Sequence, residues 1–268
     1  MAISLLKKKK KKMGNKIENK LKALLKEGKK ALAWLIDPDK IVEDLSFLQQ
    51  VKEMSQLNLD FIFIGGSLIE KNDIDRIIKL IKEVDSELPI LLFPGSVVQF
   101  SNHADGILFL SLISGRNPDL LIGQHVTIAP LLAKSNLEVL PTGYMLIDGG
   151  VATSVNYISQ TIPLPNNKPE LAVATALAGS FLGLRYFYLD AGSGAKKPVS
   201  SAIIQNVKKA VSAPIIVGGG LDSLEKVKIA YQAGADLVVI GNGAEKNLSL
   251  LTEALEYINV LNLSLNIN

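Results

Sequence analysis

Cysteine is absent from this sequence of 268 residues, and only two histidines and one tryptophan occur in it. A chain without thiols has no disulfide framework, no thiolate metal site and no cysteine nucleophile. The two histidines fit no metal-ligand spacing and belong to no recognisable triad. We expect His103 in a short loop and His125 on a helix, and we assign neither a role. The lack of cysteine suits a cytoplasmic protein, which is the location that we expect.

A long hydrophobic run is also missing. The longest uncharged apolar stretch is LAVATALAGSFLGL, residues 171–184, which is shorter than the ~20 residues that span a bilayer. Because it is rich in alanine and glycine, it predicts a buried helix packed closely on a sheet.

The net charge of +3 comes from one short segment. Six lysines stand at residues 7–12, and without them the chain carries a charge of −3. This balance argues against a nucleic-acid partner. Residues 1–14 lack the long apolar region of a signal peptide and predict a disordered basic tail or a non-native extension before Met13. The other interpretation is a polybasic arm that is attracted to anionic lipid.

Short apolar runs alternate with amphipathic segments along the rest of the chain. Most of the runs are continuous and rich in β-branched or aromatic residues, as in strands that are covered on both faces of a parallel sheet. Helical periodicity lies between them, for example in residues 73–84 and 223–234. The pattern predicts an α/β protein with a TIM (β/α)₈ barrel. The eight runs are residues 31–36, 59–64, 89–93, 105–113, 143–148, 185–190, 214–218 and 236–241.

Two irregular stretches modify this barrel. Residues 94–104, PGSVVQFSNHA, are too few for a crossover helix with its loops, so we expect a loop in place of the third helix. Residues 160–170 contain three prolines and predict an ordered or mobile loop after the fifth strand. Residues 15–27 predict an additional helix that caps the bottom of the barrel. We expect a single barrel domain over residues 15–262 and a C-terminal tail over residues 263–268.

Glycine clusters follow several of the predicted strands. They are GGS at residues 65–67, DAGSGAKK at 190–197, GGG at 218–220 and GNG at 241–243. Phosphate-binding barrels commonly hold the anion on backbone amides after the seventh and eighth strands, where glycine lets the backbone approach closely. The last three clusters therefore predict a phosphate site, although glycine at a strand end can also simply form a turn.

Two aspartates at strand ends are candidates for chemistry. Asp37, in DPDK, and the Ser67 hydroxyl offer oxygen ligands for Mg²⁺; in the structural alternative Asp37 or Asp39 caps a helix, a role that suits Asp39 well. Asp190 stands beside the phosphate loops and is placed to accept a proton from a substrate hydroxyl. Its structural alternative is a helix cap or a partner for a nearby lysine.

The motifs LIDPDK, FIGGS, YLDAGSGA, IVGGGL and VIGNG resemble, in order and spacing, the geranylgeranylglyceryl phosphate synthase family, which includes bacterial heptaprenylglyceryl phosphate synthase. The resemblance covers residues 31–247, and the family's barrel also lacks the third helix. It implies a prenyltransferase that joins sn-glycerol 1-phosphate to a polyprenyl diphosphate, with geranylgeranyl diphosphate as the expected donor. The products would be an ether phospholipid precursor and diphosphate, formed with Mg²⁺ as cofactor.

The resemblance also implies roles for individual residues. Asp37 and Ser67 match the metal site, while Asp190 and Tyr188 match the catalytic positions, where Tyr188 would face a developing cation. One departure is that the family usually has glutamate at the position of Asp190, and aspartate is one methylene shorter. The implied glycerol-phosphate site consists of Tyr188, Leu189, Asp190, Ala191, Gly192, Ser193, Gly194, Gly219, Gly220, Gly241 and Asn242.

Other functions and properties stay open at this stage. A sugar-phosphate isomerase would need a second acid, for which Asp148 is the candidate, and a non-catalytic phosphate- or lipid-binding barrel would need none. Residues 94–100 and 109–114 are expected to line a groove for the prenyl chain. From the resemblance we expect a homo-oligomer, either a dimer or a hexamer, and the apolar substrate makes a peripheral membrane contact an expectation as well. The prenyl length does not follow from the sequence.

Overall fold

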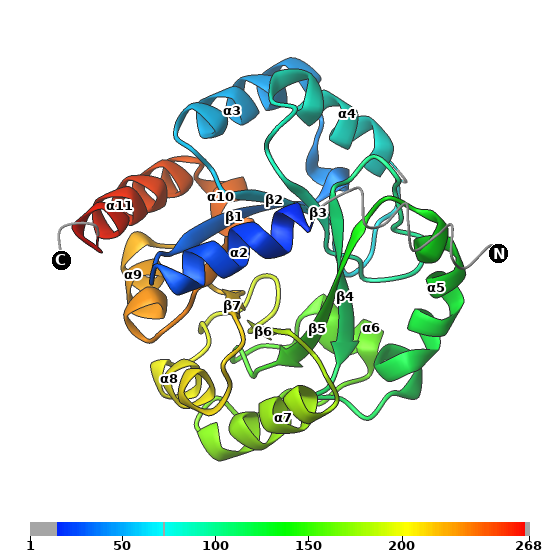
Figure 1. Ribbon diagram of the computed structural model, residues 1–268, viewed down its shortest axis with the longest axis vertical. Coiled ribbons are helices and arrows are strands. Elements are labelled where there is room, and N and C mark those ends of the chain that lie inside the picture. The colour runs from blue at the N-terminus through cyan, green and yellow to red at the C-terminus, as the bar shows by residue number, and fades with distance from the viewer. Residues whose placement is uncertain (1–14, 72, 266–268) are drawn as a thin grey trace.

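The computed structural model describes residues 15–71 and 73–265, and the predicted tail over residues 1–14 lies outside this part. Eight parallel strands close into a barrel in chain order, because β1 pairs with both β2 and β8 (Figure 1). The predicted barrel is therefore confirmed. The strands are β1 Ala31–Ile36, β2 Phe61–Ile64, β3 Ile90–Leu92, β4 Gly106–Leu112, β5 Glu138–Leu146, β6 Tyr186–Asp190, β7 Ile215–Gly218 and β8 Leu237–Ile240.

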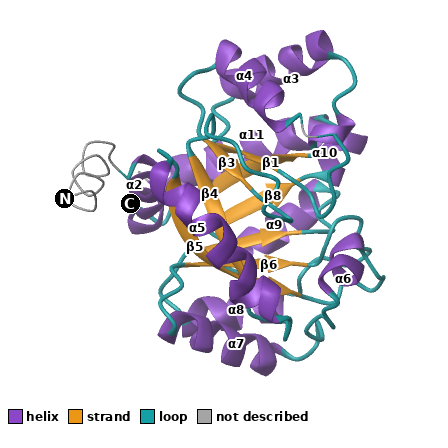
Figure 2. Cartoon of the chain, turned by 90° about the vertical axis from the view of Figure 1, so that its right-hand side faces the viewer, coloured by secondary structure: helices purple, strands orange, loops and turns teal. Residues whose placement is uncertain are grey.

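Helices surround the barrel, as Figure 2 shows from the side. Their apolar faces turn inward, as in α4, where Ile74, Ile77, Ile78 and Ile81 are buried. The longer helices are α2 Lys16–Lys26, α3 Asp44–Gln56, α4 Ile74–Val84, α5 Gln124–Lys134, α7 Pro169–Phe181, α8 Ser201–Ala210, α9 Leu224–Gln232 and α11 Ser249–Leu265. The short ones are the 3₁₀ turn Pro38–Lys40, the π turn Asp119–Gly123, α6 Ser154–Ser159 and α10 Asn242–Lys246. None of the helices in the described part is long and apolar enough to cross a membrane.

Apolar side chains form two layers, because successive residues of a strand point to opposite faces. Along β4, Leu108 and Leu112 pack inside the barrel. Ile107 belongs to the layer between the barrel and its helices, and Phe109 packs against that layer. The alternation places Tyr144 and Tyr188 in the interior, whereas Leu189 belongs to the outer layer.

The connection from β3 to β4 has no helix in residues 93–105, all of which the structure describes. The predicted loss of the third helix is thus confirmed. Gln99 organises part of this loop: its side-chain oxygen accepts from the Gly95 amide at 3.1 Å, and its amide nitrogen donates to the Gly66 carbonyl at 2.8 Å. The loop is thereby fastened to the segment that follows β2.

Helix α2 crosses the bottom of the barrel, as predicted for residues 15–27 (Figure 1). The amides of Ile17 and Glu18 donate to the Glu138 carboxylate at 2.9 and 2.7 Å. Glu18 also pairs with Arg185 at 2.6 Å. These contacts tie the first helix to the starts of β5 and β6.

An acid also stands directly before each of the strands β2, β4 and β8. Each carboxylate accepts the amide of a residue at or near the start of the preceding strand and pairs with a lysine, so it links two neighbouring strands. The acids are Asp60, Asp105 and Asp236, which accept from Leu32, Ile90 and Ile215 at 3.1, 2.8 and 2.8 Å. Their lysine partners are Lys20, Lys82 and Lys208, at 3.2, 2.7 and 2.6 Å.

Four sequence predictions need correction or completion. Strand β5 begins at Glu138 rather than at residue 143, because Pro141 interrupts the apolar pattern without interrupting the pairing with β4. Only the small residues of α7 are buried, and Phe181 at its end is 85% exposed, so this helix is not buried all round. The loop 160–170 is ordered by Asn166, whose amide nitrogen donates to the Asp148 and Pro198 carbonyls. Helix α11 continues to Leu265, into the expected tail.

Candidate active site

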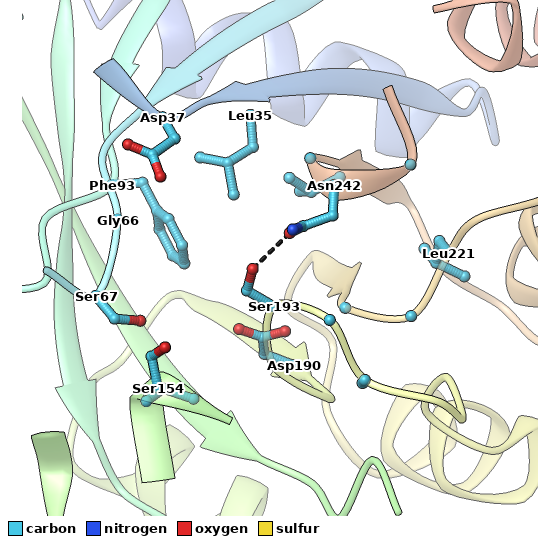
Figure 3. A pocket seen from close by; sticks show the side chains of 18 of the residues that line it. Leu35, Asp37, Gly66, Ser67, Phe93, Ser154, Asp190, Ser193, Leu221 and Asn242 are labelled. Atoms are coloured by element: carbon cyan, nitrogen blue, oxygen red, sulfur yellow. Dashed lines mark hydrogen bonds between the residues drawn. The ribbon is translucent and has the colours of Figure 1, made fainter. Parts of the chain in front are cut away.

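One cavity, with about 1180 Å³ of empty space partly open to solvent, lies at the carboxyl ends of the strands (Figure 3). Each strand except β4 contributes to its lining, either through its own residues or through the segment that follows it. We call it the main cavity. Ten of the sequence-predicted site residues line it, namely Asp37, Ser67, Tyr188, Asp190, Ser193, Gly194, Gly219, Gly220, Gly241 and Asn242.

Three predicted residues do not line the main cavity. Leu189 points to the outer layer because it alternates with Tyr188 and Asp190 along β6. Ala191 and Gly192 instead hold the backbone after the strand: the Ala191 amide donates to the Gly218 carbonyl, and the Gly192 amide donates to the Asp190 carboxylate.

Backbone glycines form the side of the cavity next to β6, β7 and β8. Gly219 has a φ of +79°, and a Cβ there would lie 2.5 Å from Asp190 Oδ1. Glycine is therefore required both by the backbone conformation and by the close approach. The Ser193 hydroxyl donates to the Asn242 side-chain oxygen and so joins the loop after β6 to α10 (Figure 3). This glycine-lined cup suits an anion that is held by backbone amides.

Asp190 lies at the inner end of this cup and is 7% exposed. One carboxylate oxygen accepts from the Gly192 amide at 2.8 Å, and the other accepts from the Tyr144 hydroxyl. Burial raises the pKa of Asp190, and the hydrogen bonds from Tyr144 and Gly192 partly offset that rise. A buried carboxylate with a raised pKa, inside a cavity, is a good proton acceptor.

Aromatic rings form the floor beside Asp190. Phe93 stacks on Tyr188 with ring centroids 5.0 Å apart and an angle of 17° between the planes. Tyr144 lies 5.6 Å from Tyr188 and 6.1 Å from Phe93. Phe93 covers part of the Tyr188 ring, so three rings rather than Tyr188 alone form this floor.

The capping at the end of β1 differs from the sequence interpretation, in which Asp39 suited the role of helix cap well. Asp37, not Asp39, caps the 3₁₀ turn, and its Oδ1 accepts from the Asp39 amide at 3.1 Å. Asp39 instead accepts from the amides of Glu70 and Lys71, which follow β2, at 2.7 and 2.9 Å. The cause is the extended conformation of Asp37, which turns its side chain back over the following turn.

The fit of a magnesium ion can be tested on these residues. Asp37 Oδ2 makes no hydrogen bond to any residue of 15–71 or 73–265, and the Ser67 hydroxyl lines the same cavity (Figure 3). Burial raises the pKa of Asp37, an effect that a bound cation would counter. Within the described residues no three acidic, histidine or cysteine side chains form a metal cluster. One carboxylate and one hydroxyl suit a Mg²⁺ that takes its other ligands from water and substrate phosphate.

A second chamber opens from the main cavity, and we call it the inner chamber. Its empty space is about 650 Å³ including some open to solvent, and it shares Ser67, Phe93, Tyr144 and Val155 with the main cavity. Its further walls are largely apolar, with Leu110, Leu112, Leu120 and Ile158 among them. The polar cup and an apolar chamber thus meet at Tyr144.

Sequence reasoning missed Phe93, Tyr144 and Ser154 as lining residues. Phe93 directly follows β3, so a search of strand ends for aromatic residues would have found it. Tyr144 lies inside a strand, where only the direction of the side chain reveals its role. Asp148, the candidate for the second acid of an isomerase, is exposed, accepts from the Gly150 amide at 2.9 Å and does not line the main cavity. His103 lies in the β3–β4 loop and His125 on α5, as expected.

Comparisons with known proteins agree with this geometry. A family model described as the PcrB family matches residues 25–258. A geranylgeranylglyceryl phosphate synthase of Spirosoma linguale is 53% identical over 226 residues, which cover 84% of this chain and 90% of the relative. A protein of the same name from Pyrococcus furiosus is 40% identical over 212 residues and covers 79% of this chain and 83% of the relative.

A solved structure is also similar. It is the crystal structure of (S)-3-O-geranylgeranylglyceryl phosphate synthase from Thermoplasma acidophilum in complex with the substrate sn-glycerol-1-phosphate. It is 31% identical to this chain with a TM-score of 0.81, and the match covers 88% of this chain and 96% of that one. The likeness therefore extends over nearly the whole barrel.

Proposed function

The chain belongs to the PcrB family, and from this premise we propose that it is a prenyltransferase of the geranylgeranylglyceryl phosphate synthase type. It joins sn-glycerol 1-phosphate to a polyprenyl diphosphate, with geranylgeranyl diphosphate as the expected donor, and releases diphosphate. The observation that carries the proposal is the meeting of a glycine-lined polar cup and an apolar chamber at Tyr144, whose hydroxyl donates to Asp190. A phosphorylated glycerol and an apolar chain need these two environments side by side.

The polar cup fits the phosphate of the acceptor. Amides near Gly219, Gly220 and Gly241 can approach the anion closely, and the hydrogen bond between Ser193 and Asn242 fixes two sides of the cup. A phosphate held there places the glycerol hydroxyls next to the buried carboxylate. The acceptor is thus oriented before it reacts.

The reaction makes one bond and breaks another. A glycerol hydroxyl oxygen bonds to C1 of the prenyl chain, and the bond between C1 and the diphosphate oxygen breaks. The hydroxyl proton passes to the Asp190 carboxylate, which Tyr144 and Gly192 hold in place. The rings of Phe93, Tyr144 and Tyr188 stabilise positive charge that develops on C1.

We propose Asp37 and Ser67 as the residues that hold Mg²⁺. The ion would neutralise charge on the departing diphosphate. Asp37 lines the main cavity and Ser67 lines both the main cavity and the inner chamber, so the diphosphate end of a donor would lie between them. The inner chamber then receives the first isoprene units of the chain.

A non-catalytic phosphate-binding barrel is the alternative that the short Asp190 side chain favours. Aspartate retracts the carboxylate by about 1.5 Å relative to glutamate, and displacements of that size can lower the reaction rate by a large factor. We favour activity, because the Tyr144 hydrogen bond fixes the carboxylate inside the cavity. Cytoplasmic location, peripheral membrane contact and a dimeric or hexameric assembly stay predictions.

Turnover with radiolabelled sn-glycerol 1-phosphate, Mg²⁺ and prenyl diphosphates of different lengths tests the proposal. We expect label in the organic phase for the wild type and loss of that label in Asp37→Ala. Omission of Mg²⁺ tests the metal separately. Binding of glycerol phosphate without turnover of any donor would instead establish the non-catalytic alternative.

A further inference from the structure

The charged side chains of the main cavity do not match the charge of its proposed substrates. Both substrates are anions, yet four carboxylates line the cavity, namely those of Asp37, Asp190, Asp222 and Glu245. Lys246 is the only cationic side chain among the described residues that line it. A phosphate group that enters this space therefore meets four acids and a single ammonium group.

Each of the four acids already has a polar partner within the protein. The partners are Lys40 for Glu245 at 3.3 Å, Lys226 for Asp222 at 2.7 Å, the Asp39 amide for Asp37 at 3.1 Å, and Tyr144 and Gly192 for Asp190. The Lys246 ammonium, by contrast, makes no ion pair and no hydrogen bond with any residue of 15–71 or 73–265. Among the charges of the cavity, this ammonium is therefore the one left available for a ligand.

The position of Lys246 directs its side chain toward the polar cup. Lys246 ends helix α10, which begins at Asn242 beside the cup. Residues four apart lie on the same face of a helix, about 6 Å apart along its axis. Every Cα–Cβ bond also tilts toward the helix N-terminus, so the lysine points back toward Asn242. Its flexible four-carbon stem spans such a distance, which brings the ammonium to the glycine backbone of the cup.

Helix α10 is fixed on two sides. The Ser193 hydroxyl donates to the Asn242 side-chain oxygen and joins the helix to the loop after β6 (Figure 3). The ion pair between Glu245 and Lys40 joins it to the turn after β1. Lys246 itself is exposed. Only the lysine side chain must therefore move to contact an anion in the cup.

The chemistry of the two substrates favours the acceptor phosphate as the partner of Lys246. The donor diphosphate has a proposed metal site at Asp37 and Ser67. The acceptor phosphate has only uncharged amides in the cup, and the Asp190 carboxylate lies at the inner end of the same cup. An ammonium donates a charge-assisted hydrogen bond, which is stronger than one from a neutral amide. It also offsets the negative charge of the nearby carboxylate.

We propose that Lys246 binds the phosphate of sn-glycerol 1-phosphate as a further residue of the acceptor site. This inference rests on the proposed function. The ammonium donates to one phosphate oxygen, while backbone amides near Gly219, Gly220 and Gly241 donate to the others. Lys246 contacts neither the glycerol hydroxyls nor the donor, so it contributes to acceptor binding and not to the chemical step.

Calorimetry with sn-glycerol 1-phosphate alone tests this inference. For Lys246→Ala we expect Kd to rise about tenfold, the loss of one hydrogen bond from a charged group. KM for the acceptor should rise by a similar factor, while kcat and KM for the donor stay unchanged. The difference from the wild type should shrink as the salt concentration rises, because salt screens an exposed charge. Lys246→Arg keeps the charge and should retain most of the affinity.

Lys71→Ala is the matched control, because it removes the same charge at the same end of the barrel. Lys71 follows β2, is exposed and does not line the main cavity, and only its backbone amide is bound, by Asp39. Its Kd should equal that of the wild type. Circular dichroism verifies folding, and Lys246→Gln answers the same question if the alanine variant does not fold.

The outcomes separate this inference from the proposed function. An unchanged Kd in a folded Lys246 variant overturns the inference alone, as does an equal loss in Lys71→Ala. A rise in KM for the donor instead of the acceptor overturns it as well, since the lysine would then bind the diphosphate. A wild type that binds sn-glycerol 1-phosphate but turns over no donor contradicts the proposed function, while the Kd values still decide the role of Lys246. A wild type that does not bind sn-glycerol 1-phosphate overturns both.

Discussion

Asp190 and Tyr144 act as a unit, because the aspartate is buried and its second oxygen is bound by the tyrosine hydroxyl. We expect Asp190→Asn to lower kcat by about 100-fold or more, the usual contribution of a general base. The affinity for sn-glycerol 1-phosphate should change little, because the proposed phosphate site consists of backbone amides and Lys246. Asp190→Glu is the matched variant, which should retain or raise kcat. Steady-state kinetics and calorimetry measure both quantities, and an active Asp190→Asn would rule out this carboxylate as the base.

The pH dependence of turnover tests the role of Tyr144. The base must be ionised, so activity falls as the pH drops through the pKa of Asp190. The Tyr144 hydrogen bond lowers that pKa, against the rise that burial causes. Tyr144→Phe should therefore raise the pKa further and move the acidic limb of the kcat profile to higher pH. Tyr186→Phe is the control, since Tyr186 is buried in the same barrel interior but does not line the main cavity. An acidic limb that stays in place in Tyr144→Phe contradicts the pairing.

The sequence predicted the polar residues of the site better than the aromatic ones. Asp37 follows β1 directly, Ser67 follows β2 after two glycines, and Asp190 is the last residue of β6. Parallel strands bring such positions to one end of a barrel. Tyr144 could not be assigned in this way, because its direction depends on where β5 begins and Pro141 concealed that start. Leu189 shows the opposite error, since a motif match ignored the alternation of side chains along β6.

At the scale of elements, the turn after β2 and the β3–β4 loop pack against each other without room for a side chain. A Cβ on Gly65 would lie 1.9 Å from the Phe93 carbonyl oxygen. We expect Gly65→Ala to destabilise the fold by about 2 kcal/mol in urea unfolding, as overpacking of a rigid contact does. Gly183→Ala is the control: φ is +89° there but nothing lies within 4 Å, so only backbone strain of about 1 kcal/mol is added. Equal losses would show that the contact with Phe93 is unimportant.

Length was the most useful signal for the elements. The loss of the third helix follows from the few residues between two apolar runs, and helix α2 follows from its periodicity. The short α6, Ser154–Ser159, gave no such signal, because six residues carry too little periodicity to separate a helix from a loop. The inner chamber beside α5 depends on side-chain packing and was not predictable as a separate space.

For the molecule as a whole, stability and chemistry lie at opposite ends of the barrel. Asp236 accepts the Ile215 amide at 2.8 Å and pairs with Lys208 at 2.6 Å, far along the strands from the main cavity. We expect Asp236→Asn to lower the free energy of unfolding by about 2 kcal/mol, since it weakens hydrogen bonds to a charged group. Affinity for sn-glycerol 1-phosphate, measured by calorimetry below the melting transition, should stay unchanged. A loss of affinity without a loss of stability would contradict this separation.

The barrel itself was predictable from eight apolar runs, because strands that are covered on both faces leave few other arrangements. What the runs do not determine is how far each strand is shifted along its neighbour. Three acids at strand starts help to set this shift, because each binds an amide of the preceding strand; they are Asp60, Asp105 and Asp236. No run of apolar residues carries this information, which depends on single side chains at strand starts.

These three acids have a consequence for the register of the sheet. Parallel strands lack a tight turn to align them, and a slip of one residue would send every inward side chain outward. Each acid accepts a hydrogen bond from one amide of the strand before it. A slipped alignment of that strand pair would lose this bond and is therefore disfavoured. The side chains at the reaction centre, Tyr144, Tyr188 and Asp190, meet only when β5 and β6 are in the correct register. Their relative positions therefore depend on contacts at the opposite end of the barrel, where the strand register is set.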